Sequence, residues 1–361
     1  MPAYKDKKNN TWYCKFNYKT WNGETKYTTK RGFATKREAA AYESDFKKRI
    51  TGNLDMSFAE FVKLYREDHY PRIRISTAAN KDNIIDTKIL PFFKERKVTE
   101  ITAKDIIKWQ NELLRYRNPK TGLPYAKTYL RTVHSIMSAI MNYAVKYYDL
   151  KENPVDRAGS IGISNAEEMQ FWTLEEYQRF SDSMMEDPFY FFCFEVLYWC
   201  GLREGELLAL SFDDFDFESK TISVTKTYQV VRGKEIVGPP KTAKGNRIVS
   251  MPDQLCEEMK DYFAMCYDKE AERAFPTGKS CLSRALKRGV KRSGVKMIRI
   301  HDLRHSHISL LISMGYSPVE IAKRVGHESI TITLRYAHMF PSVQDRMMNR
   351  LNELMKDGRG C

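Results

Sequence analysis

The sequence lacks the features of secreted, membrane-spanning and zinc-ribbon proteins. Its N-terminus has no secretory hydrophobic region, and its most apolar run, Pro188 to Cys200, is interrupted by Glu195 and is too short to span a bilayer. The seven cysteines are odd in number and include no C-x-x-C pair, which argues against a disulfide framework and against a zinc ribbon. We therefore expect a cytoplasmic protein with reduced thiols and no membrane partner.

Acidic residues are few relative to basic ones. The 361 residues include 60 Lys and Arg against 46 Asp and Glu, so the net charge is +14. This balance predicts a polyanionic partner, and the aromatic content of 12% favours nucleic acid over a membrane surface. A hydrophobic content of 42% is enough for two or three domains with their own cores.

The first 50 residues form a basic segment with signals for a small β-sheet followed by a helix. They hold 13 Lys and Arg against 5 Asp and Glu. Residues 12–20 and 25–30 flank Asn22-Gly23, a strong hairpin signal because both central residues of a type I′ turn need positive φ. A capping box then predicts a helix over residues 35–49.

A basic sheet that carries aromatic residues can enter the major groove of DNA. The alternative is an appendage that only increases solubility. We assign residues 1–55 to a DNA-binding domain, with candidate contacts at Trp12, Lys15, Tyr18, Lys19 and Lys26.

Residues 56–152 read as a four-helix domain. A capping box at Ser57 and Glu60 starts the first helix, and Pro91 separates the second from the third. The later helical runs cover roughly residues 77–89, 103–116 and 126–148. Because the apolar stripes predict core, only outward cations are candidates for the DNA backbone, namely Lys104, Lys127 and Arg131.

The second half of the chain begins after a break in periodicity. Residues 153–170 are rich in Gly, Ser, Asn and Pro and predict a linker. The domain at 171–361 is mainly helical, with strand-like segments at 221–231 and 247–251. The expected fold class is thus mainly α with small β elements (α+β).

Three short motifs near the C-terminus gather the groups that cleave a phosphodiester. They are His301-Asp302-Leu303-Arg304-His305-Ser306-His307, Val325-Gly326-His327 and Leu334-Arg335-Tyr336. A phenol can attack phosphorus while guanidinium groups neutralise charge and imidazoles move protons, without a metal or nucleotide cofactor. Taken singly, each residue has a structural alternative: Arg203 could pair with Glu204 or Glu206, Tyr336 could pack in a core, and His301, His305 and His307 could bind zinc. Because no H-E-x-x-H pattern or cysteine pair accompanies these histidines, we interpret His305 and His307 as helix-packing or backbone-bonding residues.

In these motifs the chain resembles the tyrosine recombinases, the phage integrase family. The order of residues matches that family's catalytic pattern, including nine residues from the histidine of V-G-H to the tyrosine; Val325 stands where leucine is common. The resemblance implies a covalent 3′-phosphotyrosine intermediate, no cofactor and a homotetramer on double-stranded DNA. The implied catalytic residues are Arg203, Lys241, His301, Arg304, His327 and Tyr336.

Each implied role answers a chemical need. A phenol with a pKa of about 10 needs a base before it attacks, and His301 or His327 can supply one. Arg203 and Arg304 can bind the non-bridging oxygens. The resemblance assigns the general acid to Lys241, with Lys244 and Lys226 as nearby rivals.

The N-terminal domain favours integrases of phages and conjugative transposons of Gram-positive bacteria, which bind arm sites as well as core sites. We therefore expect a nucleoid-associated integrase that works with an excisionase or a DNA-bending protein. The alternatives are a Xer-like resolvase, a non-cutting DNA-binding regulator of the same fold, and a type IB topoisomerase. The C-terminal stripe of Val343, Met347, Leu351, Leu354 and Met355 predicts a helix that docks on a neighbouring subunit.

Overall fold

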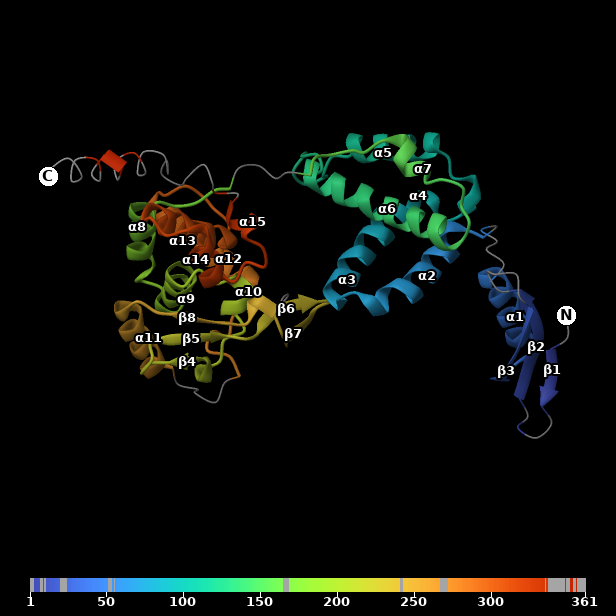
Figure 1. Ribbon diagram of the computed structural model, residues 1–361, viewed down its shortest axis with the longest axis horizontal. Coiled ribbons are helices and arrows are strands. Elements are labelled where there is room, and N and C mark those ends of the chain that lie inside the picture. The colour runs from blue at the N-terminus through green and yellow to red at the C-terminus, as the bar shows by residue number, and fades with distance from the viewer. Residues whose placement is uncertain are drawn as a thin grey trace. The chain divides into compact units, whose positions relative to one another are not determined.

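The computed structural model divides into two compact units, Met1–Ala166 and Glu167–Cys361 (Figure 1). Among the described residues, no helix is long and apolar enough to cross a membrane. The residues described are 3–6, 9, 11–19, 25–50, 54, 56–164, 169–240, 243–266, 272–334, 336, 348, 351–352 and 355.

The N-terminal residues fold into a three-stranded antiparallel sheet covered by one helix. The strands β1 (Ala3–Asp6), β2 (Thr11–Lys19) and β3 (Thr25–Phe33) pair in that order, and α1 (Lys36–Ile50) follows. The predicted pair of strands and the helix are confirmed, whereas β1 was not predicted. The Asn22-Gly23 turn lies outside the described residues.

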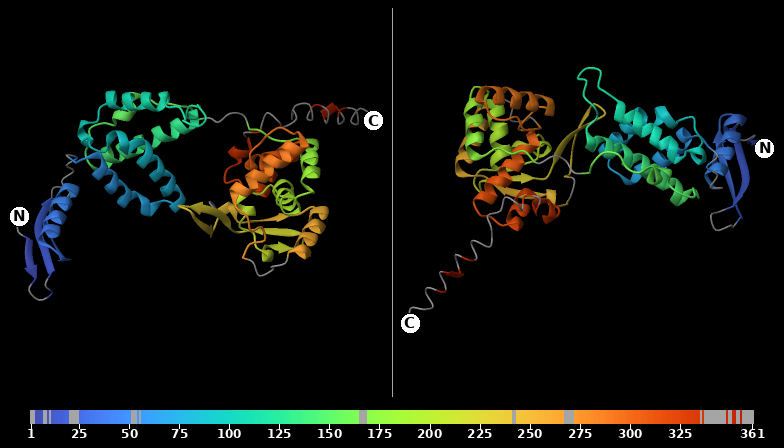
Figure 2. Two further views of the ribbon diagram at one scale, coloured as in Figure 1. Left: turned by 180° about the vertical axis from the view of Figure 1, so that it is seen from behind. Right: turned by 90° about the horizontal axis from the view of Figure 1, so that it is seen from above.

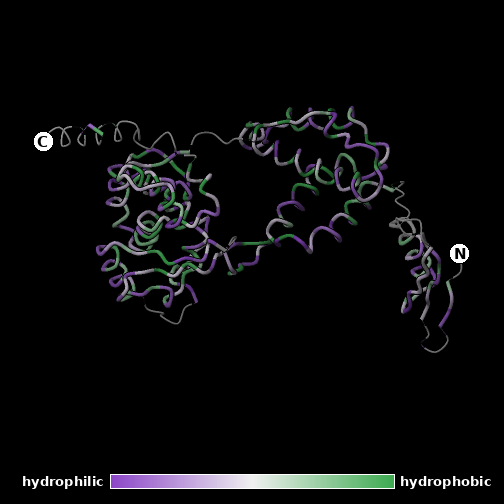
Figure 3. Tube along the Cα trace, viewed as in Figure 1, coloured by the Kyte–Doolittle hydropathy of each residue, from purple (hydrophilic) through white to green (hydrophobic). Residues whose placement is uncertain are grey.

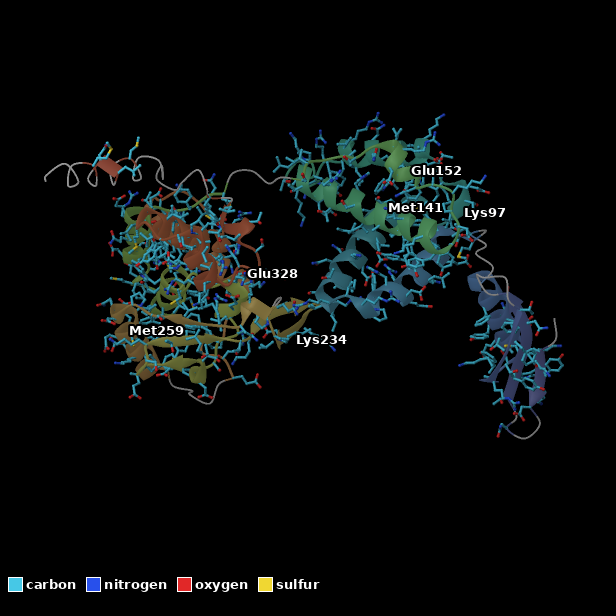
Figure 4. All side chains as sticks on the ribbon, in the orientation of Figure 1. Lys97, Met141, Glu152, Lys234, Met259 and Glu328 are labelled. Atoms are coloured by element: carbon cyan, nitrogen blue, oxygen red, sulfur yellow. The ribbon has the colours of Figure 1, made fainter. Side chains whose placement is uncertain are left out.

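A second buried cluster is built from the helices after residue 56, and the predicted capping box of Ser57 and Glu60 is confirmed. Met141 lies in this core and is labelled in Figure 4. The elements are α2 (Phe58–His69), η1 (Tyr70–Arg72), α3 (Ile75–Ile84), the π-helical η2 (Ile85–Ile89), α4 (Leu90–Phe93), η3 (Val98–Glu100), α5 (Ala103–Arg115), α6 (Lys127–Tyr147) and α7 (Pro154–Ala158).

Pro91 does not end a helix, contrary to the sequence prediction. Helical structure runs from α3 through the π-helical turn η2 into α4, which contains Pro91. A proline lacks the N–H that an α-helix needs at that point, and a wider turn accommodates the loss. The indole N–H of Trp109 donates to the carbonyl of Lys88 in this turn at 2.8 Å, so a residue of α5 satisfies an acceptor that the irregular turn presents.

The predicted linker at 153–170 begins too early. Asn153 caps α7 by accepting a hydrogen bond from the N–H of Val155 at 2.9 Å, and Val155 is buried in the core of the first unit. The cap and the proline at the first helical position are local helix signals that the low periodicity of a five-residue helix obscured.

The second unit is mainly helical and contains two small antiparallel sheets (Figures 1 and 2). Figure 3 shows hydrophobic and hydrophilic residues interspersed in both units. The sheets are β4 (Phe215–Asp216), β5 (Thr221–Val224) and β8 (Arg247–Ser250), and the hairpin β6 (Thr227–Val231) with β7 (Lys234–Gly238). The helices are α8 (Leu174–Met184), α9 (Pro188–Trp199), α10 (Glu204–Leu207), η4 (Phe212–Asp214), η5 (Ala243–Gly245), α11 (Asp253–Met265), α12 (Lys279–Ser293), α13 (Ile300–Ser313), α14 (Pro318–Val325) and α15 (Ile330–Thr333).

The β6–β7 hairpin turns at Arg232 and Gly233, whose φ angles are 51° and 79°. Positive φ at both positions fits the right-handed twist of a two-stranded ribbon. The predicted strand at 221–231 is in fact two strands, and β7 was not predicted. The hairpin leads directly to Lys241, which lies outside the described residues.

Trp109→Phe tests the bond that supports the π-helical turn. The phenyl ring keeps most of the buried packing but leaves the Lys88 carbonyl without its donor, which should cost about 1–3 kcal/mol in the free energy of unfolding. Backbone amide hydrogens of residues 85–93 should exchange faster than in the wild type, and the midpoint of urea unfolding should move to a lower urea concentration. Ile107→Ala, on the exposed side of α5, is the control; equal exchange in both variants would contradict the role given to the indole.

Candidate active site and DNA-contact surfaces

Arg203 stands at the start of α10 and is held by Glu206. Glu206 accepts hydrogen bonds from the backbone N–H of Arg203 at 2.9 Å and from its Nη1 at 2.6 Å. The carboxylate is buried, with 2% of the side chain exposed, while Arg203 remains partly open to solvent. The ion pair considered as a structural alternative therefore exists, and it leaves Arg203 accessible.

Arg304 projects from the second turn of α13 and is 2% exposed. Its Nη1 donates to the carbonyl of Gly201 at 2.8 Å. Gly201 has a φ of 61°, and a Cβ there would lie 2.5 Å from the His307 ring, so only glycine brings this carbonyl so close to α13. Burial and the charge of Arg203 lower the pKa of Arg304 to about 9.

Three consecutive carbonyls at the end of α14 each accept a hydrogen bond from a different arginine. The last carbonyls of a helix have no partner within the helix and carry partial negative charge, so this end attracts cations. The pairs are Arg247 Nε to Arg324 O at 3.0 Å, Arg304 Nη2 to Val325 O, and Arg203 Nη2 to Gly326 O at 3.1 Å.

Gly326 makes this arrangement possible. It caps α14 with a φ of 68°, and a Cβ at this position would lie 2.8 Å from the Lys244 carbonyl. The left-handed turn directs the chain into His327 immediately after the carbonyls that hold the arginines. Glu328, the next residue, is labelled in Figure 4.

Arg247 is the second partner of Glu206 and had not been predicted from the sequence. Its Nη2 and Nη1 lie 2.8 Å and 3.2 Å from the two carboxylate oxygens of Glu206. Burial alone would raise the pKa of Glu206, but the hydrogen bonds and charge of Arg247, with the charge of Arg203, lower it to about 2. One buried carboxylate thus forms ion pairs with two of the guanidinium groups.

His301 and His327 lie in the positive field of the two arginines. Desolvation by surrounding protein atoms, then the charges of Arg304 and Arg203, lowers the pKa of His301 below its ordinary value, although part of its surface stays in solvent. The same causes lower the pKa of His327 to about 3. Nδ1 of His327 lies 2.8 Å from Oγ1 of Thr333, whereas His301 is exposed. Both imidazoles are therefore neutral at physiological pH.

The Tyr336 hydroxyl contacts a histidine that had been given only a packing role. Tyr336 is 1% exposed, and its hydroxyl is hydrogen-bonded to Nδ1 of His305. Its ring packs in a cluster with Ile308, Ile321 and Val325. The prediction for His305 was wrong because the contact joins residues 31 positions apart and no local pattern announces it.

The two rivals of Lys241 have other partners. Lys226 Nζ lies 2.8 Å from a carboxylate oxygen of Asp214, which neutralises it. Lys244 donates to the carbonyl of Glu328 at 3.0 Å, which places it beside the loop that carries His327.

His307 has the packing role predicted for it. It is buried in α13, and its Nε2 accepts a hydrogen bond from Nε of Arg324 at 3.1 Å. Within the described part of the chain, no group of three or more His, Cys, Asp or Glu side chains could hold a metal ion.

The N-terminal sheet has one covered and one open face. Trp12 is partly buried and packs with Cys14 and Phe16 on the face that α1 covers, so the geometry does not favour it as a DNA contact. Strand alternation explains this, because residues two apart share a face. The open face carries Tyr4, Tyr13, Lys15, Tyr27 and Arg31, with Arg31 5.2 Å above the Tyr13 ring and Lys15 5.4 Å above the Tyr27 ring.

The remaining candidate contacts are distributed over helices. Lys104 on α5 and Lys127 on α6 are exposed, and Arg131 on α6 is half-buried. The side chains of Tyr18, Lys19 and Lys26 lie outside the described residues. The sequence prediction also missed α12, whose 15 residues include six Lys and Arg and no acidic residue, a compositional signal visible before folding.

Comparison with known proteins identifies related sequences and folds. Three family models match: the Arm DNA-binding domain at residues 2–50, the Phage integrase N-terminal SAM-like domain at 57–114, and the Phage integrase family at 170–342. The ICEBs1 integrase of Bacillus subtilis is 28% identical over 343 residues, which cover 89% of this chain and 91% of that protein.

Two solved structures have the same fold. The Tn1549 transposon integrase in complex with a circular intermediate DNA covers 82% of this chain and 99% of its own, with a TM-score of 0.67 and 17% identity. A lambda integrase tetramer bound to a Holliday junction covers 92% of this chain and 97% of its own, with a TM-score of 0.57 and 17% identity.

The fold and the clustered arginines, histidines and tyrosine define a DNA strand-transferring enzyme of the tyrosine recombinase class. The chain belongs to the phage integrase family.

Glu206→Gln tests the charge balance of the site. Because the pKa of Glu206 is about 2 in the folded protein against an ordinary value of 4.5, its stabilisation is present above pH 4.5 and is lost as the pH falls through 2. The difference in unfolding free energy between the wild type and the variant should shrink by about 3 kcal/mol over that window. Chemical unfolding from pH 5 to pH 2 measures it. Glu218→Gln, at an exposed turn, controls for the lost carboxylate, and the same pH profile in both variants would rule out the proposed balance.

Proposed function

We propose that Arg203 and Arg304 hold the scissile phosphate of DNA while Tyr336 attacks it. The observation that carries this proposal is the anchoring of both guanidinium groups to the adjacent carbonyls of Val325 and Gly326. Arginine has five N–H donors, so each group keeps donors for phosphate oxygens beyond those used in the anchor. Fixed donors stabilise charge on the transition state without reorganising.

The reaction conserves the energy of the phosphodiester. The Tyr336 Oη–P bond forms as the bond from phosphorus to the 5′-oxygen breaks, and the leaving oxygen takes a proton from the general acid, which we assign to Lys241. A 5′-hydroxyl of a second strand then displaces Tyr336, so exchange needs no ATP. His327, in the loop after Gly326, forms a hydrogen bond with the phosphate.

The chain is a site-specific recombinase of the integrase type. The arm-binding match at its N-terminus supports an integrase in preference to a Xer-like resolvase. We place arm-site binding on residues 1–55, core-site binding on 56–152 and on α12, and catalysis on residues 171–361. Four subunits would form the synapse, by analogy with the lambda integrase tetramer. An excisionase or a DNA-bending protein would set direction, and the DNA substrate places the activity at the bacterial nucleoid.

The C-terminal stripe would dock on a neighbouring subunit. Of its described members, Leu351 and Met355 are about half exposed, as expected for a surface awaiting a partner; Val343, Met347 and Leu354 lie outside the described residues. A non-cutting regulator of the same fold would have no need of the two anchored arginines.

Tyr336→Phe should bind DNA as the wild type does and form no covalent adduct, because only the hydroxyl oxygen is lost. A nicked duplex that releases its short fragment on cleavage traps the adduct, which is read on a denaturing gel. Tyr316→Phe, at an exposed position beyond α13, is the matched control and should keep full activity. An adduct in the Tyr336 variant would assign the nucleophile elsewhere.

Arg31→Ala tests the open face of the N-terminal sheet. Loss of one phosphate contact should weaken binding of the full chain to duplex DNA by about tenfold and lower the slope of log K against log salt by about 1. Anisotropy titrations over a range of KCl concentrations measure both quantities. Arg37→Ala, on the exposed side of α1, is the control; equal effects from the two variants would remove the role given to this face.

A further inference from the structure

The structure places a proton acceptor on the nucleophile itself. The hydroxyl of Tyr336 is hydrogen-bonded to Nδ1 of His305, and both side chains are largely removed from solvent. His305 lies on α13 directly after Arg304, so the helix that supplies a phosphate-binding group also supplies the contact to the attacking oxygen. An enzyme nucleophile held by a base in this way is already aligned for proton transfer.

A buried carboxylate lies near the second ring nitrogen of His305 and favours one tautomer. Oδ1 of Asp302 lies 3.9 Å from Nε2 of His305, too far for a hydrogen bond but close enough for its charge to favour a proton on Nε2. Asp302 is fixed by Arg299, whose Nε and Nη2 donate to it at 3.0 Å and 2.8 Å. With the proton on Nε2, the lone pair of Nδ1 faces the Tyr336 hydroxyl and accepts its proton.

The imidazoles of His327 and His301 make other contacts. Nδ1 of His327 is engaged with Thr333, and His301 packs edge-on against His305, with ring centroids 4.9 Å apart and an interplanar angle of 83°. His301 is exposed to solvent. His305 is thus the histidine whose imidazole contacts the Tyr336 hydroxyl.

We propose that His305 is the general base of cleavage and the general acid of rejoining. As Oη of Tyr336 bonds to phosphorus, its proton moves to Nδ1 of His305, and the electron pair of the breaking P–O bond leaves with the 5′-oxygen, which is protonated by the general acid. In rejoining, the 5′-hydroxyl attacks phosphorus and returns its proton to the deprotonated general acid. The bond from Tyr336 to phosphorus breaks, and Nδ1 of His305 returns its proton to the phenolate. The inference rests on the proposed function of Tyr336.

The electrostatics of the site link the base to the substrate. Burial, then the charge of His301 and of nearby arginines, lower the pKa of His305 to about 4, although Asp302 opposes this. The free protein therefore holds a neutral acceptor that is a weak base. A phosphodiester anion bound at Arg304 would offset the positive field and strengthen the base only when DNA is in place.

His305→Gln and His305→Asn test this role. Both keep a polar group but cannot accept a proton, so single-turnover cleavage of the nicked duplex should fall by about 100-fold or more while DNA binding stays unchanged. Site-specific replacement of Tyr336 by a fluorinated tyrosine that ionises near neutral pH should restore much of the lost rate, because an acidic phenol needs no base. The same replacement in otherwise wild-type protein should change the rate little.

His301→Asn is the matched control, since it lies on the same face of α13. Its cleavage defect should not be relieved by the fluorinated phenol. Faster cleavage by the His305 variants would mean that His305 only restrains Tyr336, and a defect unchanged by the fluorinated phenol would mean a structural role; either result overturns the proposal. If the variants fail to bind DNA, strong acceleration of the wild type by the fluorinated phenol would overturn it equally.

The two proposals can fail separately. An adduct formed by the Tyr336→Phe protein removes the nucleophile and with it the role of His305. Loss of the adduct in that protein, combined with wild-type cleavage in both His305 variants, removes only the role of His305.

Discussion

The C-terminus of α14 is the feature on which the active site depends. Three consecutive carbonyls at this end accept hydrogen bonds from Arg247, Arg304 and Arg203. Gly326 turns the chain there in a space too narrow for a side chain. A helix end attracts cations, but three guanidinium groups repel one another, so the arrangement also needs the buried carboxylate of Glu206. The positions of the three arginines therefore depend on helix capping at Gly326 and on the charge of Glu206.

The free protein has more positive charge at this point than its own acids balance. Burial is the largest cause of the lowered pKa values of Arg304, His305 and His327, and neighbouring positive charges lower them further. Under the proposed function, a phosphodiester bound by Arg203 and Arg304 supplies the missing anion. Burial and the positive charges keep the imidazoles neutral before DNA binds, and we propose that the bound phosphate then raises their basicity.

Local patterns could be predicted from the sequence because their physics is local. The capping box of Ser57 and Glu60 involves residues three apart, and the motif order around Arg304 and Tyr336 indicates the chemistry without coordinates. Contacts across the chain could not be predicted in this way. His305 meets Tyr336 only through the packing of α13 against α14 and the loop that follows, and Arg247 reaches Glu206 only when β8 pairs with β5.

The errors in the fold have similar causes. Pro91 stays inside a helix because Trp109, from another helix, satisfies the irregular turn. Trp12 was selected together with residues of the open face because charge alone does not say which side of a sheet a helix will cover. The short α7 has too few residues for a periodic signal, and tertiary burial of Val155 stabilises it.

A structure of the protein bound to a cleaved duplex and orthovanadate tests the central claim most directly, because vanadate adopts the five-coordinate geometry of the phosphoryl transition state. The account predicts vanadium bonded to Oη of Tyr336, with N–H groups of Arg203 and Arg304 on its equatorial oxygens. Vanadate bound to another residue, or bound to Tyr336 with both guanidinium groups turned away from it, would contradict the account.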